Sequence, residues 1–212
     1  MPEKRYFRRK ICLLGDAAVG KTSLIQRYVL DKFDDKYFVT LGTKVTMKDV
    51  TVEKPEKDEV VNLTLMIWDI LGQREFKRLQ TSFYKGSNGT IVVADFTRKE
   101  TLDHIPEWIL ALFNTAGKVP VLLLINKSDL TNQAAYGEEE IVSLAEKYNT
   151  QYLFTSAKTG DNVEEAFVRM SQMLLQHDGK GKDKDTSSAP NQQSGSGKED
   201  RVSGKSTEKQ SS

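Results

Sequence analysis

Two glycines, a lysine and a hydroxyl residue near the start of the chain have a spacing that suits phosphate chemistry. Four residues separate Gly15 from Gly20, and Lys21 and Thr22 follow directly. Glycine lets a loop fold closely around an anion, and the N–H groups at a helix start point towards it. We expect Lys21 to reach the outer phosphates and Thr22 to ligate Mg²⁺. The predicted phosphate-binding loop comprises Gly15, Asp16, Ala17, Ala18, Val19, Gly20, Lys21, Thr22 and Ser23.

A second group of polar residues has the chemistry to recognise guanine. Asn126, Lys127 and Asp129 follow an apolar run, and Ser156, Ala157 and Lys158 follow another. A carboxylate such as that of Asp129 accepts paired hydrogen bonds from N1 and the 2-amino group of guanine, whereas adenine offers no such pair. A backbone N–H from the second segment could donate to the guanine O6. Together with the phosphate loop, this pattern predicts a guanine-nucleotide site.

A third group lies beyond Trp68. Asp69 stands where a carboxylate that supports a metal is required, and Gly72 where a backbone N–H must approach a terminal phosphate. Gln73 has the chemistry to orient an attacking water. The predicted catalytic residues are therefore Gln73, Lys21 and Gly72.

Short apolar runs must form the elements that position these groups. They cover residues 10–14, 60–68, 90–95, 119–125 and 151–154, and amphipathic helical patterns lie between several of them. This alternation predicts a mostly parallel sheet that is covered on both faces. Residues 44–52 and 60–68 are predicted to form a hairpin, so one strand is antiparallel. The polar groups then meet at the carboxyl ends of the strands, where open α/β sheets bind ligands.

Composition limits the other classes of function. Basic and acidic residues number 31 and 30, which gives no reason to expect nucleic-acid binding. The basic residues among positions 4–10 favour a solvated approach to the first strand, with a membrane surface or an acidic partner as the alternative. The single cysteine, Cys12, is interpreted as a buried apolar residue, and no run is long enough to span a bilayer. We expect a domain at 1–177 and a disordered polar tail at 178–212, because the tail has almost nothing to bury.

The order and spacing of these motifs resemble those of the Ras superfamily of small GTPases over about residues 8–176, and the resemblance is closest to the Ras and Rab branches. It implies a P-loop α/β fold in which five helices flank a six-stranded sheet with one antiparallel strand. It also implies roles for residues that no motif reveals. Thr40 matches the threonine that contacts Mg²⁺ and the terminal phosphate, which makes the predicted metal set Thr22, Thr40 and Asp69. Phe33 and Lys127 match the residues that pack on guanine, and Tyr37 the tyrosine near the phosphates.

The chain departs from the family pattern at several positions. Leu71 replaces a small residue next to Gly72, and Arg74 reverses a charge after Gln73. Ala17 lies where the family varies, and Val45 replaces an aromatic residue of the Rab branch. No C-terminal cysteine is available for prenylation, so a prenyl anchor is not expected in this chain.

The leading hypothesis is a monomeric, cytoplasmic GTP-binding switch, at most peripherally associated with membranes, that hydrolyses GTP slowly with Mg²⁺. An exchange factor, a GTPase-activating protein and effectors are expected to bind through residues 34–45 and 70–85. The alternative is a GTP-loaded binding module with negligible hydrolysis, which Leu71 and Arg74 favour. A third class, an ATP-using P-loop enzyme, is disfavoured by Asn126 and Asp129.

Overall fold

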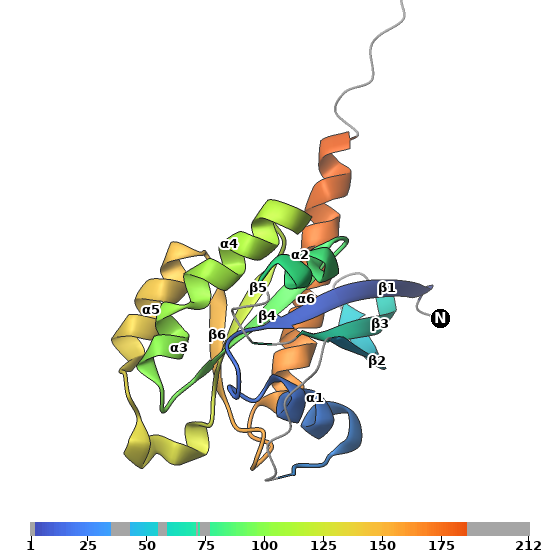
Figure 1. The fold of residues 1–212 in the computed structure, drawn as a ribbon. Helices are drawn as coiled ribbons and strands as arrows, with labels where there is room; N and C mark the ends of the chain where they lie inside the picture. Colours follow the sequence, from blue (N-terminus) through green and yellow to red (C-terminus); the bar gives the residue numbers. More distant parts are fainter. Residues whose placement is uncertain (1–2, 35–42, 55–58, 71, 73–76, 186–212) are drawn as a thin grey trace, which may run out of the picture.

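A six-stranded sheet forms the centre of the computed structural model, which describes residues 3–34, 43–54, 59–70, 72 and 77–185. The strand order is β2-β3-β1-β4-β5-β6, and only the β2–β3 pair is antiparallel (Figure 1). The strands are β1 (Glu3–Leu14), β2 (Thr43–Lys54), β3 (Glu59–Ile70), β4 (Gly89–Asp95), β5 (Val121–Asn126) and β6 (Gln151–Thr155). The predicted hairpin and the mostly parallel sheet are therefore confirmed.

Helices cover the two faces of the sheet. They are α1 (Lys21–Leu30), α2 (Lys77–Tyr84), α3 (Lys99–Asp103), α4 (Ile105–Ala116), α5 (Glu138–Lys147) and α6 (Val163–Asp185), with a 3₁₀ segment, η3, at Ser128–Gln133. Residues of α1 and α6 share one apolar cluster with the strands, and residues of α2 to α5 share the other. This is the three-layer arrangement that a buried parallel sheet requires.

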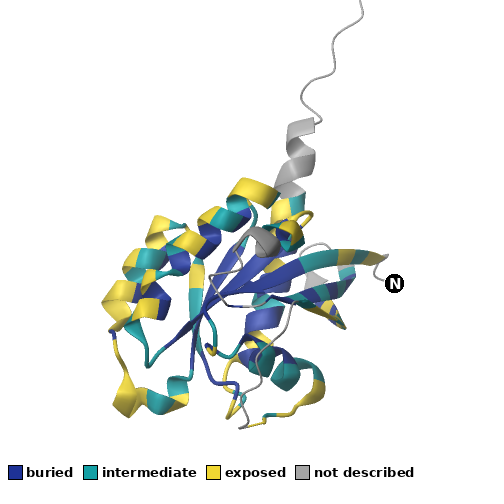
Figure 2. Cartoon of the chain, in the orientation of Figure 1, coloured by how far each residue is buried: buried dark blue, intermediate teal, exposed yellow. Residues whose placement is uncertain are grey.

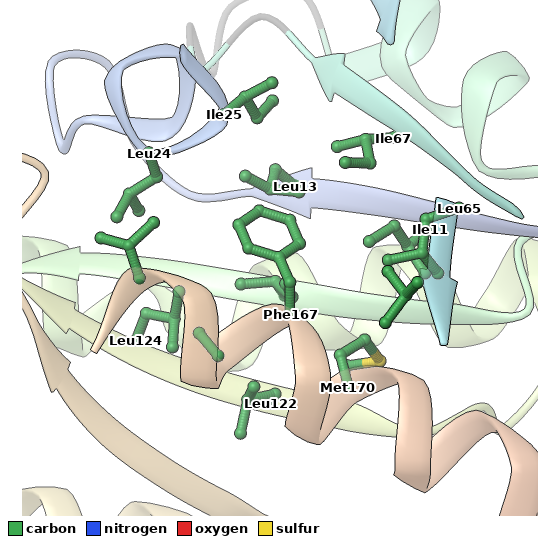
Figure 3. Close-up of a cluster of buried hydrophobic side chains, with 14 of the residues drawn as sticks. Ile11, Leu13, Leu24, Ile25, Leu65, Ile67, Leu122, Leu124, Phe167 and Met170 are labelled. Carbon is green, nitrogen blue, oxygen red and sulfur yellow. The ribbon is translucent and has the colours of Figure 1, made fainter. Parts of the chain in front are cut away.

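The two apolar clusters follow from the alternation of side chains along the strands. Ile11 and Leu13 of β1 face α1 and α6, where Phe167 lies in the middle of the cluster (Figure 3). Cys12 and Leu14 face the opposite helices, and Cys12 is fully buried as expected. Both faces of the central strands are consequently buried, whereas the outer sides of the helices are exposed (Figure 2).

Three boundaries differ from the expectations. β1 begins at Glu3 and not at residue 10, because the basic segment pairs with β3 from Glu3 onward and Phe7 within it packs on the core. The predicted set of five helices becomes six among the described residues, because α3 ends at Asp103 and α4 begins at Ile105, followed by Pro106, which has no N–H to donate to the preceding turn. The last helix, α6, continues to Asp185, so its final residues belong to the segment expected to form the tail; residues 186–212 of that tail lie outside the described part, and its disorder stays a prediction.

Candidate nucleotide-binding site

The polar groups singled out by the sequence gather at one edge of the sheet. β1, β3, β4, β5 and β6 are parallel, so their carboxyl ends lie on the same side. After β1 the chain forms β2 and β3 on one side of it and then β4 to β6 on the other. The strand order therefore reverses at β1. In open α/β sheets this is where ligands bind. The loop after β1 therefore occupies the expected position.

The backbone of this loop requires its two glycines. Gly15 has a φ of +132°, and a Cβ placed on it would lie 2.2 Å from the carbonyl oxygen of Val93 on β4. Gly20 has a φ of +100°, and its Cβ would lie 2.2 Å from Nδ2 of Asn126. α1 begins directly after Gly20, which has no side chain to cap it. The first N–H groups of α1 are thus left for a ligand, as in other anion sites at helix N-termini.

Lys21 is held inside the loop that it is predicted to serve. Its Nζ donates hydrogen bonds to the carbonyl oxygens of Gly15 and Asp16, at 2.7 and 2.8 Å. Burial lowers the pKa of Lys21 to about 8, although the nearby carboxylates of Asp69 and Asp16 oppose that shift. A polyphosphate would supply the negative charge that favours the protonated amine.

Gly72 lies against this lysine. A Cβ on Gly72 would lie 2.4 Å from Nζ of Lys21 and 2.5 Å from the carbonyl oxygen of Asp16. The backbone after β3 therefore approaches the loop more closely than a side chain would allow. The approach of the Gly72 N–H to a terminal phosphate stays a prediction.

Thr22 and Asp69 form a pair that fits Mg²⁺. The Thr22 hydroxyl donates to Asp69 Oδ2 at 2.6 Å, which joins α1 to the end of β3. Asp69 is 2% exposed, and its Oδ1 is a buried atom without a hydrogen-bond partner within the described residues. Burial raises the pKa of Asp69, although the Thr22 hydroxyl and Lys21 oppose the shift. A hydroxyl and a carboxylate are oxygen ligands of the kind that Mg²⁺ prefers, so the residues fit the ion. Residues 15–23, Asp69 and Gly72 are referred to below as the phosphate end.

The residues predicted to bind guanine are held mainly by Asn126. This residue is 1% exposed, and its Nδ2 donates to the carbonyl oxygen of Val19 in the phosphate-binding loop at 2.8 Å. Its Oδ1 accepts from the Ala157 N–H at 3.2 Å and from the Thr155 hydroxyl at 3.3 Å. The Ser156 hydroxyl donates to Oδ1 of the exposed Asp129 at 2.7 Å. Asn126, Asp129 and residues 156–158 are referred to below as the base end.

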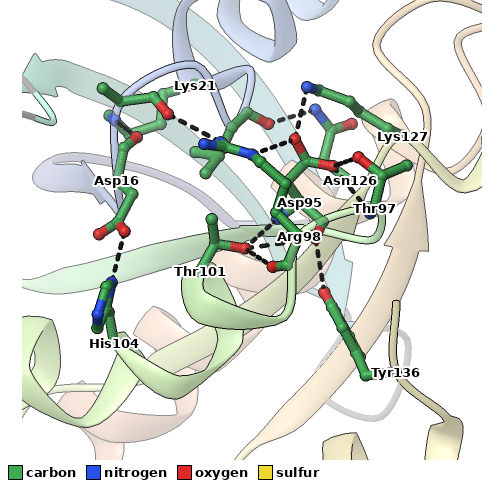
Figure 4. A network of polar contacts seen from close by, with 12 residues as sticks. Asp16, Lys21, Asp95, Thr97, Arg98, Thr101, His104, Asn126, Lys127 and Tyr136 are labelled. Atoms are coloured by element: carbon green, nitrogen blue, oxygen red, sulfur yellow. Dashed lines mark hydrogen bonds and ion pairs between the residues drawn. The ribbon is translucent and has the colours of Figure 1, made fainter. Parts of the chain in front are cut away.

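Asp95, which none of the sequence motifs reveals, lies between the two ends. Asp95 is the last residue of β4, is fully buried, and takes part in a network of polar contacts (Figure 4). Its carboxylate accepts from Nζ of Lys127 at 2.6 Å, from Nε of Arg98 at 2.9 Å, and from the backbone N–H and hydroxyl of Thr97. Arg98 in turn donates to the carbonyl oxygen of Ala17 at 2.9 Å. The strand-end rule that located the other groups could have located Asp95 too.

Asp16, the second residue of the loop, is held by two side chains that the sequence did not predict to contact it. Asp16 Oδ1 accepts from Nε1 of the buried Trp108 at 2.9 Å, and Asp16 Oδ2 lies 2.6 Å from Nδ1 of His104. The loop is thereby tied to α4. No local pattern signals this contact, because His104 lies 88 residues from Asp16 in the sequence.

Several predicted residues lie outside the described part: Tyr37, Thr40 and Gln73, together with Leu71 and Arg74. Phe33 is described and packs, half-buried, against the apolar cluster of α1 and α6. Ser23 lies in the first turn of α1, and Lys158 is exposed after β6. The structure thus brings together the predicted residues of the phosphate end and of the base end.

The sequence matches the model of the Ras family over residues 10–176. Ras-related protein Rab-13 of Canis lupus familiaris is 33% identical over 182 residues, which cover 85% of this chain and 87% of that protein. Ras-related protein RABD2b of Arabidopsis thaliana is 37% identical over 166 residues, covering 78% of this chain and 79% of that protein. Ras-related protein RABA4a of the same plant is 36% identical over 159 residues, 74% of this chain and 68% of that protein.

The fold and the site together define a P-loop GTPase. The chain belongs to the Ras family, and its relatives make it a Rab-like member of the Ras superfamily of small GTPases. As such it is a GTP-binding switch of a family that binds guanine nucleotides with Mg²⁺ and hydrolyses GTP. Within the described ranges, no helix has both the length and the apolar character needed to cross a membrane.

Proposed function

We propose that this chain cycles between GTP-bound and GDP-bound states and hydrolyses GTP slowly at the carboxyl edge of its sheet. The observation that supports this most directly is the meeting of the phosphate end and the base end around one residue. Asn126 donates to the carbonyl oxygen of Val19 and accepts from the N–H of Ala157. A single nucleotide that spans both ends would therefore have its base and its phosphates placed by one connected framework.

The base and the phosphates use different donors. The N–H groups of residues 16–23 and the Lys21 ammonium bind the phosphates. The Ala157 N–H donates to the guanine O6, and the Asp129 carboxylate accepts from N1 and the 2-amino group. Phe33 and the stem of Lys127 pack on the base, and Tyr37 lies near the phosphates, as the resemblance to the superfamily implies.

Thr22, Thr40 and Asp69 hold the metal ion in this proposal. Bound there, Mg²⁺ would supply positive charge next to the phosphate oxygens of the nucleotide. The Thr22 hydroxyl and the Asp69 carboxylate would hold the ion, and Thr40 would join them in the GTP state. The buried Oδ1 of Asp69 supports this assignment, because it is an acceptor without a partner in the part of the chain that the structure describes.

Hydrolysis requires an oriented water. Gln73 orients it towards the terminal phosphorus; the new P–O bond forms as the bond to the β-phosphate oxygen breaks, and GDP and inorganic phosphate leave. Arg98 is adjacent to the loop, but its guanidinium is engaged by Asp95 and by the Ala17 carbonyl oxygen. We therefore expect slow intrinsic turnover and a gain of about 10³–10⁵-fold from an activating protein that supplies an arginine.

Loss of the terminal phosphate releases Thr40 and Gly72 from it. Residues 34–43 and 71–83 then relax, and partners read the change. An exchange factor, an activating protein and effectors bind a cytoplasmic monomer through residues 34–45 and 70–85. Val45, 42% exposed, and the neighbouring Trp68–Phe83 ring pair support this surface among the described residues.

Single-turnover hydrolysis of GTP tests the proposal. The parent protein should release phosphate at a rate on the order of 10⁻⁴–10⁻² s⁻¹, and Gln73→Leu should slow it at least about tenfold. Gln151→Leu is the matched control, because Gln151 is exposed at the start of β6, and it should hydrolyse at the parent rate. A Gln73→Leu protein that hydrolyses GTP as fast as the parent would contradict the assigned role.

The alternative function is a GTP-loaded binding module with negligible hydrolysis. The observation that favours it is the large residue Leu71, which precedes Gly72 in the sequence. The backbone of Gly72 lies so close to Lys21 that a Cβ on Gly72 does not fit. The same single-turnover assay separates the two functions. Phosphate release from the parent, with or without cell extract, supports the switch, whereas none over many hours supports the module.

A further inference from the structure

The guanidinium of Arg27 connects α1 with the loop that follows β6. Arg27 lies in the second half of α1, six residues beyond Lys21. Its Nε donates to the carbonyl oxygen of Ala157 at 2.9 Å, and its Nη2 donates to that of Lys158 at 2.6 Å. Its Nη1 donates to Oδ1 of Asp31 at 3.0 Å. Three nitrogens of one planar group thus bind three separate acceptors, a geometry that only arginine offers.

The loop is held from its other side by Asn126. Ala157 is 4% exposed and its N–H donates to Asn126 Oδ1, while its C=O accepts from Arg27. The loop also closes on itself, because the Gly160 N–H donates to the carbonyl oxygen of Ser156 at 2.8 Å. Since both of its polar groups are engaged, the backbone direction at Ala157 depends on Arg27 as well as on Asn126.

Arg27 also constrains the chain that leaves α1. The Asp31 N–H donates to the carbonyl oxygen of Arg27 at 3.0 Å, and Asp31 has a φ of +51°. Phe33, which is expected to pack on the base, follows two residues after Asp31. The side chain of Arg27 is 20% exposed, and its hydrogen bond to Ala157 is partly buried.

We propose that Arg27 is a positioning residue for guanine: by holding the C=O of Ala157 it fixes the backbone from which the Ala157 N–H exchanges its 3.2 Å hydrogen bond to Asn126 Oδ1 for one to the O6 of the base. The inference rests on the proposed nucleotide site. In this proposal α1 positions residues at both ends of the site. Lys21 and Thr22 in its first turn bind the phosphates, and Arg27 orients the loop whose N–H recognises O6. A mere structural tether would support all nucleotides equally, whereas a positioning residue supports those with an O6.

Replacement of Arg27 by methionine separates these roles, because Arg27→Met keeps an unbranched stem and removes the guanidinium. Dissociation constants are measured in Mg²⁺ for GDP and for 2-aminopurine riboside diphosphate, which keeps the 2-amino group and lacks O6 and the N1 hydrogen. The missing N1 contact affects the analogue equally in parent and variant, so it cancels when the two proteins are compared. We expect Arg27→Met to weaken GDP binding roughly tenfold and the analogue by no more than about twofold.

Two further variants complete the test. Arg169→Met removes a half-buried arginine that pairs with Glu165 on α6, and it should leave both dissociation constants unchanged. Arg27→Lys keeps the charge but not the planar fork, and it should lower the preference for GDP over the analogue about threefold. If Arg27→Met does not fold, the Arg27→Lys preference decides.

Equal weakening of both nucleotides, or no weakening of either, would overturn the positioning role. Failure of the underlying function has a different signature, which appears in the unmodified protein. A parent chain that binds GDP no more tightly than ADP in the same assay would refute the guanine site itself, whatever the Arg27 variants do.

Discussion

The base end and the phosphate end of the site differ in what completes them. At the base end the protein supplies its own partners: Asn126 uses both atoms of its amide group, and Ser156 donates to Asp129. At the phosphate end Lys21 is buried against backbone carbonyl oxygens, and Asp69 has a buried oxygen without a partner among the described residues. We infer that the base end is preformed, whereas ligand and metal complete the phosphate end.

Because of this difference, variants at the two ends should differ in their effects on ligand binding and on the free energy of unfolding. A change at Asp69, whose free carboxylate oxygen is left for the metal, should weaken ligand and metal binding and leave the free energy of unfolding of the nucleotide-free protein nearly unchanged. A change at the base end should lower both quantities, because the same hydrogen bonds support the ligand and the fold.

Removal of the metal should have the largest effect. Chelation with EDTA should accelerate GDP release from the parent by about 10²-fold or more, because a bound divalent cation contributes several kcal/mol at phosphate oxygens. Asp69→Asn should release GDP quickly already in Mg²⁺ and respond less than about threefold to EDTA. Release is followed with a fluorescent GDP in the presence of excess unlabelled GDP. Asp49→Asn, an exposed change on β2, should retain the full response; an equally large EDTA response in Asp69→Asn would contradict the metal assignment.

Asn126→Ala should reduce both binding and stability. The substitution leaves the Val19 C=O and the Ala157 N–H without their partner in a buried region, which costs about 1–3 kcal/mol for each group. We expect GDP affinity to fall roughly 10–100-fold, and the free energy of unfolding of the nucleotide-free protein to fall by about 2–4 kcal/mol. Titration with GDP and urea denaturation measure the two effects. A loss of affinity without any loss of stability would show that the base end is not preformed.

Asp95→Asn should have a smaller effect that depends on pH. Burial alone would raise the pKa of Asp95, but hydrogen bonds from Lys127, Thr97 and Arg98 outweigh it and hold the pKa below its ordinary value. Ionised Asp95 therefore stabilises the folded state above the ordinary carboxyl pKa, and that contribution is lost as the pH falls through the lowered value. Asp95→Asn should lower the free energy of unfolding by about 1–2 kcal/mol at neutral pH.

Unfolding in urea at several pH values checks this sign. The difference between parent and Asp95→Asn should be constant around neutral pH and shrink in acid, as the parent carboxylate takes up a proton. A difference that grows in acid would contradict the assignment of a lowered pKa to Asp95.

The elements of the fold could be predicted because each strand left a local signal. Uninterrupted apolar runs marked β4 and β5, and alternation on either side of a charged loop marked the hairpin of β2 and β3. The first half of β1 was missed because its basic residues look solvated, although Phe7 of that half packs on the core. A strand that is buried on only one face gives a weaker signal than one buried on both.

The site was predictable where function depends on residue type after a strand, and not where it depends on contacts between distant segments. Lys21, Asp69 and Asn126 follow or end strands, so the sheet topology brings them together. The contact of Asp16 with His104 and that of Arg27 with Ala157 span 88 and 130 residues. Such pairs appear only when the fold is known, because nothing in the local sequence of either partner requires the other.

Base selectivity tests most directly the claim that Asp129 at the preformed base end makes this a guanine site. The parent should bind GDP at least about 100-fold more tightly than ADP or xanthosine diphosphate, since the wrong base leaves polar groups of the site unpaired. Asp129→Asn offers a donor where the carboxylate only accepts, and should shift the preference to xanthosine diphosphate, whose C2 carbonyl accepts that donor. Asp103→Asn, an exposed change on α3, should keep the parent preference. An Asp129→Asn protein that still prefers GDP, or a parent that binds ADP as tightly as GDP, would contradict the account.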